Sequence, residues 1–235
     1  MSFGKLTDRD RQVLGHIARY RFTFKEVLSS LYFDGADPQK SLDRLRDDGY
    51  VVARKLFKGN RSAYQLESKG AAALGVSRRR AEGLGSEALP THLAIFSFCH
   101  LQGRPRIRLE DDEVASVFED NAPPGRYHCL ERSTRAVRVH HVYVPGDATK
   151  PADVVAMTRS HIAEVIQTPG MLPWLANQVY SHAILVESNE RRELLTKAIN
   201  GTKFDDRIQL REVAHVRVEC VPGFANLEEG LHALA

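Results

Sequence analysis

Hydrophobic residues in the first eighty positions recur at helical spacing in three short segments that turn-forming residues separate. Thr7 precedes the first segment and Thr23 the second, and either hydroxyl can cap a helix. Asp37-Pro38 opens the third, because Asp favours the N-cap and Pro the first helical position, and Gly49 ends it. The pattern predicts three short helices, within residues 6–21, 23–33 and 36–49.

After Gly49 the pattern changes to two extended segments on either side of Gly59-Asn60, a two-residue turn signal. Residues 67–74 then indicate a short closing helix. Three helices, a hairpin and a helix in this order are typical of a winged helix-turn-helix. In that arrangement the third helix enters the major groove and the hairpin tip meets the adjacent backbone or minor groove.

This arrangement predicts double-stranded DNA as the partner of the N-terminal domain. Lys58 and Arg61 flank the turn and are expected to contact phosphates or the minor groove, which positions the protein more than it specifies sequence. Because winged helices also dock proteins, a protein partner stays open as an alternative. The expected DNA-contacting residues, on the third helix and the hairpin, are Gln39, Lys40, Ser41, Arg44, Lys55, Lys58, Asn60 and Arg61.

Residues 77–90 form a break in composition, rich in Gly and Ser, with the Arg78-Arg79-Arg80 triplet near its start. The arginines either touch phosphates or are simply solvated, and both readings stay open. We therefore expect a winged helix-turn-helix domain over 1–76, a linker over 77–90 and a second domain over 91–235.

Helical and extended patterns alternate through the second domain, which predicts an α/β domain with a mixed sheet of at least four strands. The stretch 91–101 is apolar on all sides and fits either a helix or a buried strand. Asn189 is the expected cap of a helix that follows a buried strand. The whole chain is accordingly expected to be α+β. Four strands are expected, in RYHCLER, AVRVHHVYVP, SHAILVES and HVRVECVP.

Charge is distributed unevenly between the two parts of the chain. The first 80 residues hold 17 Lys+Arg against 9 Asp+Glu, a net +8, whereas the remaining residues hold 16 against 21, a net −5. A basic N-terminal domain on an acidic remainder favours an anionic partner for the first domain.

No apolar run of about 18 residues occurs, so we expect no membrane partner. The three cysteines form no CxxC pair, which is typical of reduced thiols in a cytoplasmic protein.

The first hundred residues also resemble a known family. The resemblance rests on Leu6 to Asp10, Arg19 to Phe22, Leu42 to Leu45, Asp48 to Val51, Tyr64 to Leu66 with Lys69 to Ala71, and Thr91 to Leu93. This pattern is similar to the N-terminal winged helix of the replication-relaxation family, whose members belong to plasmids and other mobile elements. The resemblance implies a DNA-binding protein related to mobilisation accessory proteins.

In that family the second part resembles a nuclease-type α/β core of the restriction-endonuclease kind. A working site there would need an acid on one strand and an acid-x-Lys set on the next, to hold a divalent metal and a water. Here Glu131 is the only carboxylate of the corresponding hairpin, and no acid-x-Lys set follows it. We therefore expect a degenerate core without catalytic residues, kept for dimerisation, sensing or protein contact.

Other candidate chemistry is weak in this sequence. Four consecutive acids, Glu110 to Glu113, open a helical pattern, where acids favour the helix dipole without any metal. His128-Cys129 and His140-His141 lie on adjacent predicted strands, but their spacing matches no compact zinc signature. Phosphate-binding glycine loops are absent from the sequence. No metal ligand and no cofactor is therefore predicted.

These observations predict a sequence-specific double-stranded DNA-binding protein, a transcriptional regulator or accessory factor of a plasmid, phage or integrative element. A homodimer is expected, with a further protein partner through residues 91–235. The alternative is a metal-dependent nuclease or mobilisation accessory enzyme, which would need a carboxylate cluster that the sequence does not supply.

Overall fold

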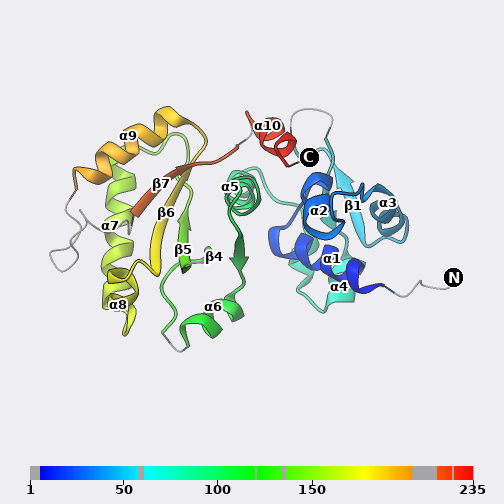
Figure 1. Ribbon diagram of the computed structural model, residues 1–235, viewed down its shortest axis with the longest axis horizontal. Coiled ribbons are helices and arrows are strands. Elements are labelled where there is room, and N and C mark those ends of the chain that lie inside the picture. The colour runs from blue at the N-terminus through cyan, green and yellow to red at the C-terminus, as the bar shows by residue number, and fades with distance from the viewer. Residues whose placement is uncertain are drawn as a thin grey trace. The chain divides into compact units, whose positions relative to one another are not determined.

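The computed structural model describes residues 6–57, 61–119, 121–133, 136–202, 216–223 and 225–234. The chain divides into two compact units, and unit 1 combines Met1–Leu93 with Phe224–Ala235. Unit 2 is Ala94–Gly223, so the division falls within helix α5 (Ala88–His100). A two-stranded sheet, a five-stranded mixed sheet and the helices around them confirm the α+β class (Figure 1).

Unit 1 follows the predicted order of helix, helix, helix, two strands and helix. Strands β1 and β2 are antiparallel, with Val51 opposite Leu66 and Arg54 opposite Ala63. The predicted turn at Gly59-Asn60 lies outside the described residues. The elements are α1 (Asp8–Tyr20), α2 (Lys25–Tyr32), α3 (Gln39–Asp47), β1 (Val51–Arg54), β2 (Ala63–Leu66), α4 (Ser68–Leu74), the 3-10 helix η1 (Arg78–Ala81) and, from the end of the chain, α10 (Leu227–His232).

The domain boundaries in the structure differ from those that composition predicts. Helix η1 lies in the expected linker, yet it packs against α4 and β2, and Arg80 donates to the Ala18 carbonyl at 3.3 Å. Helix α10 packs against α2, so the end of the chain belongs to unit 1 and not to the second domain. Contacts between segments that are distant in sequence decide both assignments, and composition alone does not reveal them.

Local interactions explain where the first two helices begin. Thr7 caps α1 as predicted, and Asp10 completes a capping box with it: the Asp10 backbone donates to Thr7 Oγ1 at 3.1 Å, and the Thr7 backbone donates to Asp10 Oδ2 at 2.9 Å. The predicted cap at Thr23 is wrong. Its backbone pairs with Tyr64 in an isolated bridge, and its hydroxyl lies 3.0 Å from His16 Nε2, so α2 begins after Phe24.

Unit 1 is built on one apolar core between its helices and the strand pair. The apolar face of α3 that the spacing predicts contributes Leu42 and Leu45, which are buried to 1% and 0% exposure. Gly49 ends α3 with a φ of +76°, a left-handed conformation that glycine adopts readily. The main members of the core are Val13, Leu14, Ile17, Leu28, Leu42, Leu45, Val51, Tyr64 and Leu66.

Unit 2 is a five-stranded mixed sheet in the order β3-β4-β5-β6-β7. The first three strands are antiparallel, and β5, β6 and β7 are parallel to one another. Helices make the parallel crossovers, α7 between β5 and β6, and α9 between β6 and β7. The elements are β3 (Arg106–Leu109), α6 (Asp111–Phe118), β4 (His128–Arg132), β5 (Val137–Tyr143), α7 (Pro151–Gln167), α8 (Met171–Ala176), β6 (Tyr180–Val186), α9 (Asn189–Asn200) and β7 (Val216–Cys220).

Helices cover both faces of this sheet. Helices α7, α8 and α9 lie on one face, and the second half of α5 lies on the other (Figure 1). The ambiguous stretch 91–101 is therefore helical. Of the helices that the structure describes, none is both long and apolar enough to cross a bilayer.

Two features of unit 2 correct the sequence predictions. The cap of α9 is Ser188, whose hydroxyl accepts from the Arg191 backbone at 3.2 Å, and Asn189 is the first helical residue. Strand β3 escaped prediction because it alternates Arg106 and Arg108 with apolar residues, and both arginines are buried. Strands with one buried face usually place apolar residues inside and polar residues outside, but in β3 the two arginines face inward and Ile107 is exposed.

Candidate functional site

The four α3 residues predicted to contact DNA lie in a nine-residue helix of unit 1, three of them in its first turn and Arg44 in its second half. Lys40 and Arg44 are exposed, whereas Gln39 and Ser41 are half-buried. The Gln39 amide donates to Asp43 Oδ1 at 3.0 Å. The side chains of Lys40 and Arg44 are therefore exposed, whereas Gln39 is held to its own helix.

Arg44 forms an ion pair with Asp10 at the start of α1. The Asp10 side chain is 4% exposed, whereas that of Arg44 is 45% exposed, so the pair bridges the interior and the surface of unit 1. Burial alone would raise the pKa of Asp10, but hydrogen bonds from Thr7 and the Arg44 guanidinium outweigh it and leave the pKa below its ordinary value. The pair fixes the position of the Arg44 guanidinium on the exposed face of α3.

Charge on α3 is mixed. Arg46 is paired with acids of its own helix, at 2.9 Å to Asp43 and 3.3 Å to Asp47. Such exposed pairs contribute little to stability, but they neutralise one cation of the helix. Of the three cations of α3, two are therefore ion-paired, Arg44 with Asp10 of α1 and Arg46 with acids of its own helix.

The predicted hairpin contacts are distributed differently. Lys55 follows β1 and is exposed, while Lys58 and Asn60 lie outside the described residues. The Arg61 guanidinium is 22% exposed and forms ion pairs with Glu26 of α2 and Glu228 of α10. The expected phosphate contact by Arg61 would therefore require the guanidinium to exchange a carboxylate for a phosphate. These contacts favour a role for Arg61 in holding α10 to unit 1.

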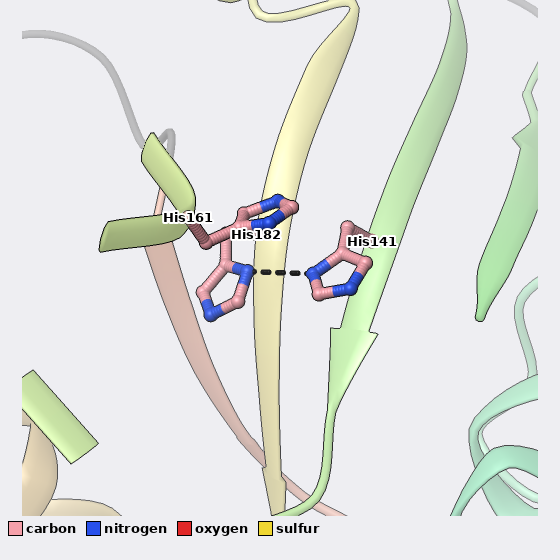
Figure 2. A group of neighbouring side chains, drawn as sticks. All are labelled: His141, His161 and His182. Atoms are coloured by element: carbon pink, nitrogen blue, oxygen red, sulfur yellow. Dashed lines mark hydrogen bonds between the residues drawn. The ribbon is translucent and has the colours of Figure 1, made fainter. Parts of the chain in front are cut away.

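A second candidate group of side chains, three histidines, lies on the α7 face of the unit 2 sheet. His141 of β5 and His182 of β6 are register partners on adjacent parallel strands, so their side chains emerge on the same face. Their Nδ1 atoms lie 2.9 Å apart (Figure 2). His161 reaches the same place from α7, the helix that connects the two strands.

The three imidazoles are close enough to share one ion. One ring nitrogen from each of His141, His161 and His182 lies within 4.8 Å of the others. The rings of His141 and His161 stack with centroids 3.9 Å apart and planes inclined by 20°. His182 is 2% exposed, whereas His141 and His161 are half-buried, so the group is covered from the sheet side and open to solvent in part.

Hydroxyl groups hold the outer nitrogens of two of these rings. The Tyr180 hydroxyl lies 3.1 Å from His161 Nε2 and 3.5 Å from Nε2 of a fourth histidine, His128. Thr158, one helical turn before His161, places its hydroxyl 3.5 Å from His182 Nε2. These contacts restrict the tautomers and orientations of the rings.

Desolvation controls the electrostatics of the cluster. Burial lowers the pKa of His161 to about 4 and that of His128 to about 4, and it lowers the pKa of His141 and His182 far below the ordinary value. Repulsion between neighbouring imidazoles lowers the pKa of His128, His141 and His182 further. The rings are therefore neutral near pH 7, and one of the two Nδ1 atoms of His141 and His182 donates a hydrogen bond to the other.

The opposite face of the same sheet carries a buried ionic network around Arg106. Its guanidinium is fully buried, donates to Glu131 Oε2 at 2.6 Å and to Glu219 Oε2 at 3.1 Å, and lies 3.7 Å from the centre of the Phe98 ring. Interaction with His140, 3.5 Å away, and with Arg106 holds the pKa of Glu131 far below its ordinary value despite burial. Glu131 is thus committed to a guanidinium, which disfavours the catalytic metal of the nuclease alternative.

Sequence reasoning found part of the histidine cluster and missed the rest. The antiparallel β4 and β5 place His128 opposite His141 and Cys129 opposite His140, as expected for adjacent strands. The alternation of side chains sends the two pairs to opposite faces, so they form no common site. The signal that identifies the cluster is that two neighbouring strands and the helix that connects them each carry a member of it: His141 on β5, His161 on α7 and His182 on β6.

Comparison with protein-family models, with curated proteins and with solved structures finds no match for this chain.

Proposed function

We propose that this chain is a double-stranded DNA-binding protein, a transcriptional regulator or accessory factor of a plasmid, phage or integrative element. The observation that carries the proposal is the exposed pair Lys40 and Arg44 on α3, with Arg44 fixed by buried Asp10. A helix of about 10 Å diameter fits the major groove, and cations at its edge attract phosphates.

Two further observations support this proposal. The strand pair follows α3 directly and β1 lies beside it, with Lys55 exposed where β1 ends (Figure 1). The first 80 residues also carry a net charge of +8, from 17 Lys+Arg and 9 Asp+Glu. We expect phosphate contacts from the exposed Lys40, Arg44 and Lys55. Arg44 is ion-paired, as Arg46 and Arg61 are, so its contact requires the guanidinium to exchange a carboxylate for a phosphate.

The proposal includes a homodimer. Helix-turn-helix dimers place their recognition helices about 34 Å apart, so a palindromic site with half-sites one helical turn apart is expected. Unit 2 is the part of the chain that we assign to dimerisation, sensing or contact with another protein. Light scattering of the protein with and without DNA measures the stoichiometry.

The direct test is fluorescence anisotropy of the full chain with labelled duplex DNA from upstream of its own gene. We expect binding at about 50–100 mM salt, where phosphate contacts dominate, and weaker binding to a scrambled duplex of equal length. Lys40→Ala should weaken binding roughly fivefold, which corresponds to about 1 kcal/mol for one charged contact. Lys197→Ala, which removes an exposed lysine from α9 in unit 2, is the matched control.

Two results would count against the proposal. Binding of a protein partner that tolerates reversal of charge at Lys40 and Lys55, with no affinity for duplex DNA, would favour the protein-docking alternative. Nicking of supercoiled plasmid in Mg²⁺ that disappears in Glu131→Ala would favour the nuclease, in spite of the Arg106 contact at that carboxylate.

A further inference from the structure

The histidine cluster of unit 2 carries an inference that is independent of DNA binding, because it lies in the other unit. We propose that His141, His161 and His182 form a binding site for a zinc ion, with the fourth coordination position open to water or another exogenous ligand. The three ligands come from one strand, helix, strand crossover, in the order β5, α7 and β6. The site is therefore assembled by the same contacts that fold this part of the sheet.

The separation of the ring nitrogens fits this metal. Zinc binds imidazole nitrogen at about 2.0–2.1 Å, so two ligands of a tetrahedral site lie about 3.3–3.4 Å apart. The His141 and His182 Nδ1 atoms are 2.9 Å apart, and the nitrogens of all three residues lie within 4.8 Å of one another. Coordination requires the metal to replace the hydrogen bond between the two Nδ1 atoms. It also requires the stacked rings of His141 and His161 to turn until their lone pairs converge on the ion.

The chemistry of the group selects among metals. The three members all present imidazole nitrogens, the ligands that suit Zn²⁺ and the later first-row transition metals, whereas Mg²⁺ and Ca²⁺ prefer carboxylate and carbonyl oxygens. Three neutral protein ligands leave the full charge of the ion uncompensated. An anionic fourth ligand, such as hydroxide, is therefore favoured, and the half-buried rings of His141 and His161 leave a side through which it can enter.

The surroundings of the rings fit the same assignment. A metal-bound histidine usually has its other ring nitrogen hydrogen-bonded, which fixes the tautomer and aims the ligand atom. His182 Nε2 lies 3.5 Å from the Thr158 hydroxyl while its Nδ1 faces His141, and His161 Nε2 lies 3.1 Å from the Tyr180 hydroxyl. Thr158 and Tyr180 are accordingly positioning residues for the proposed site.

The test uses the full-length protein, stripped of metal by dialysis against a chelator. Competition between the protein and a chromogenic chelator measures Zn²⁺ affinity, and Co²⁺ substitution reports coordination through its visible absorption. We expect about one Zn²⁺ per chain, a Co²⁺ spectrum of four- or five-coordinate type, and no competition from millimolar Mg²⁺.

Variants assign the binding to the cluster. His161→Gln and His141→Gln, at half-buried positions, should each weaken Zn²⁺ binding by more than about 100-fold, since loss of a ligand exceeds the 10–100-fold effect of an outer partner. Tyr180→Phe should weaken it by about 10–100-fold. His232→Gln is the matched control, because it removes an exposed histidine of α10 in unit 1 and should leave the affinity unchanged.

Two results would overturn the assignment. The first is that the wild-type protein, shown to be folded by its circular dichroism spectrum, binds no Zn²⁺ at concentrations up to about 100 µM. A dissociation constant of that size corresponds to a binding free energy of only about −5.5 kcal/mol. The other is Zn²⁺ affinity and a Co²⁺ spectrum that stay the same in folded His161→Gln and His141→Gln, which would place the metal elsewhere. Neither result bears on DNA binding.

Discussion

His141 and His182 are register partners on the parallel strands β5 and β6, and their Nδ1 atoms lie 2.9 Å apart. On the other side of the His141 ring, the backbone passes close by at Gly125. A Cβ added to Gly125 would lie 2.3 Å from His141 Nε2, and its φ of +111° is a conformation that residues with side chains rarely adopt. The orientation of His141 thus depends on a glycine in the loop before β4.

Gly125→Ala should therefore destabilise the protein and displace the His141 ring. We expect the free energy of unfolding to fall by about 1–3 kcal/mol, because both backbone strain and the contact with His141 oppose the new methyl group. Denaturant unfolding measures it. Gly85→Ala is the matched control, since nothing lies within 4 Å of its added Cβ, and a loss of stability as large as that of Gly125→Ala would refute the explanation.

The lowered pKa of the Asp10 carboxylate predicts that the folding stability of unit 1 decreases in acid. Its folded pKa lies below the ordinary value of 3.8, so the stability that it contributes is fully present above that value and is lost as the pH falls through the folded pKa. As the pH falls below about 4, wild-type stability should fall more steeply than that of Asp10→Asn, which has no carboxylate to titrate. Urea unfolding at several pH values measures the difference, and parallel curves for the two proteins would contradict the prediction.

Substitution of Arg61 tests whether this residue stabilises unit 1 or contacts DNA. Arg61→Ala leaves Glu26, only 12% exposed, without this guanidinium, and we expect the free energy of unfolding to fall by about 1–2 kcal/mol. Arg46→Ala, which breaks only exposed pairs on α3, should change it by less than about 1 kcal/mol. Thermal and urea unfolding of both variants measure these two losses of stability. A loss of DNA affinity in Arg61→Ala without loss of stability would instead restore the expected phosphate contact.

The sequence predicted most of unit 1 because its signals are local. Thr7, the Leu42 and Leu45 spacing and Gly49 each act within one or two turns of chain, and the structure confirms all three. The error at Thr23 arose because distant partners compete with a local preference. Thr23 has the side chain of a helix cap, but its backbone pairs with Tyr64 and its hydroxyl contacts His16.

The histidine cluster, in contrast, could not be predicted from local sequence signals. Its residues are 20 and 21 positions apart in sequence, from His141 to His161 and on to His182. Only the parallel register of β5 and β6 and the rotation of α7 bring them together, and neither follows from local propensity. The buried Arg106 of β3 was missed for a related reason, because its partner carboxylates come from β4 and β7.

The salt dependence of DNA binding tests the central claim most directly. The logarithm of the association constant for upstream duplex DNA should fall linearly with the logarithm of salt concentration. Lys40→Ala combined with Lys55→Ala should reduce the steepness by about 1.8, or about 0.9 for each lost phosphate contact. The matched double variant Lys150→Ala with Lys197→Ala, at two exposed positions of unit 2, should keep the wild-type slope. Absence of binding at about 50 mM salt, or equal slopes for all three proteins, would contradict DNA binding through α3 and the end of β1.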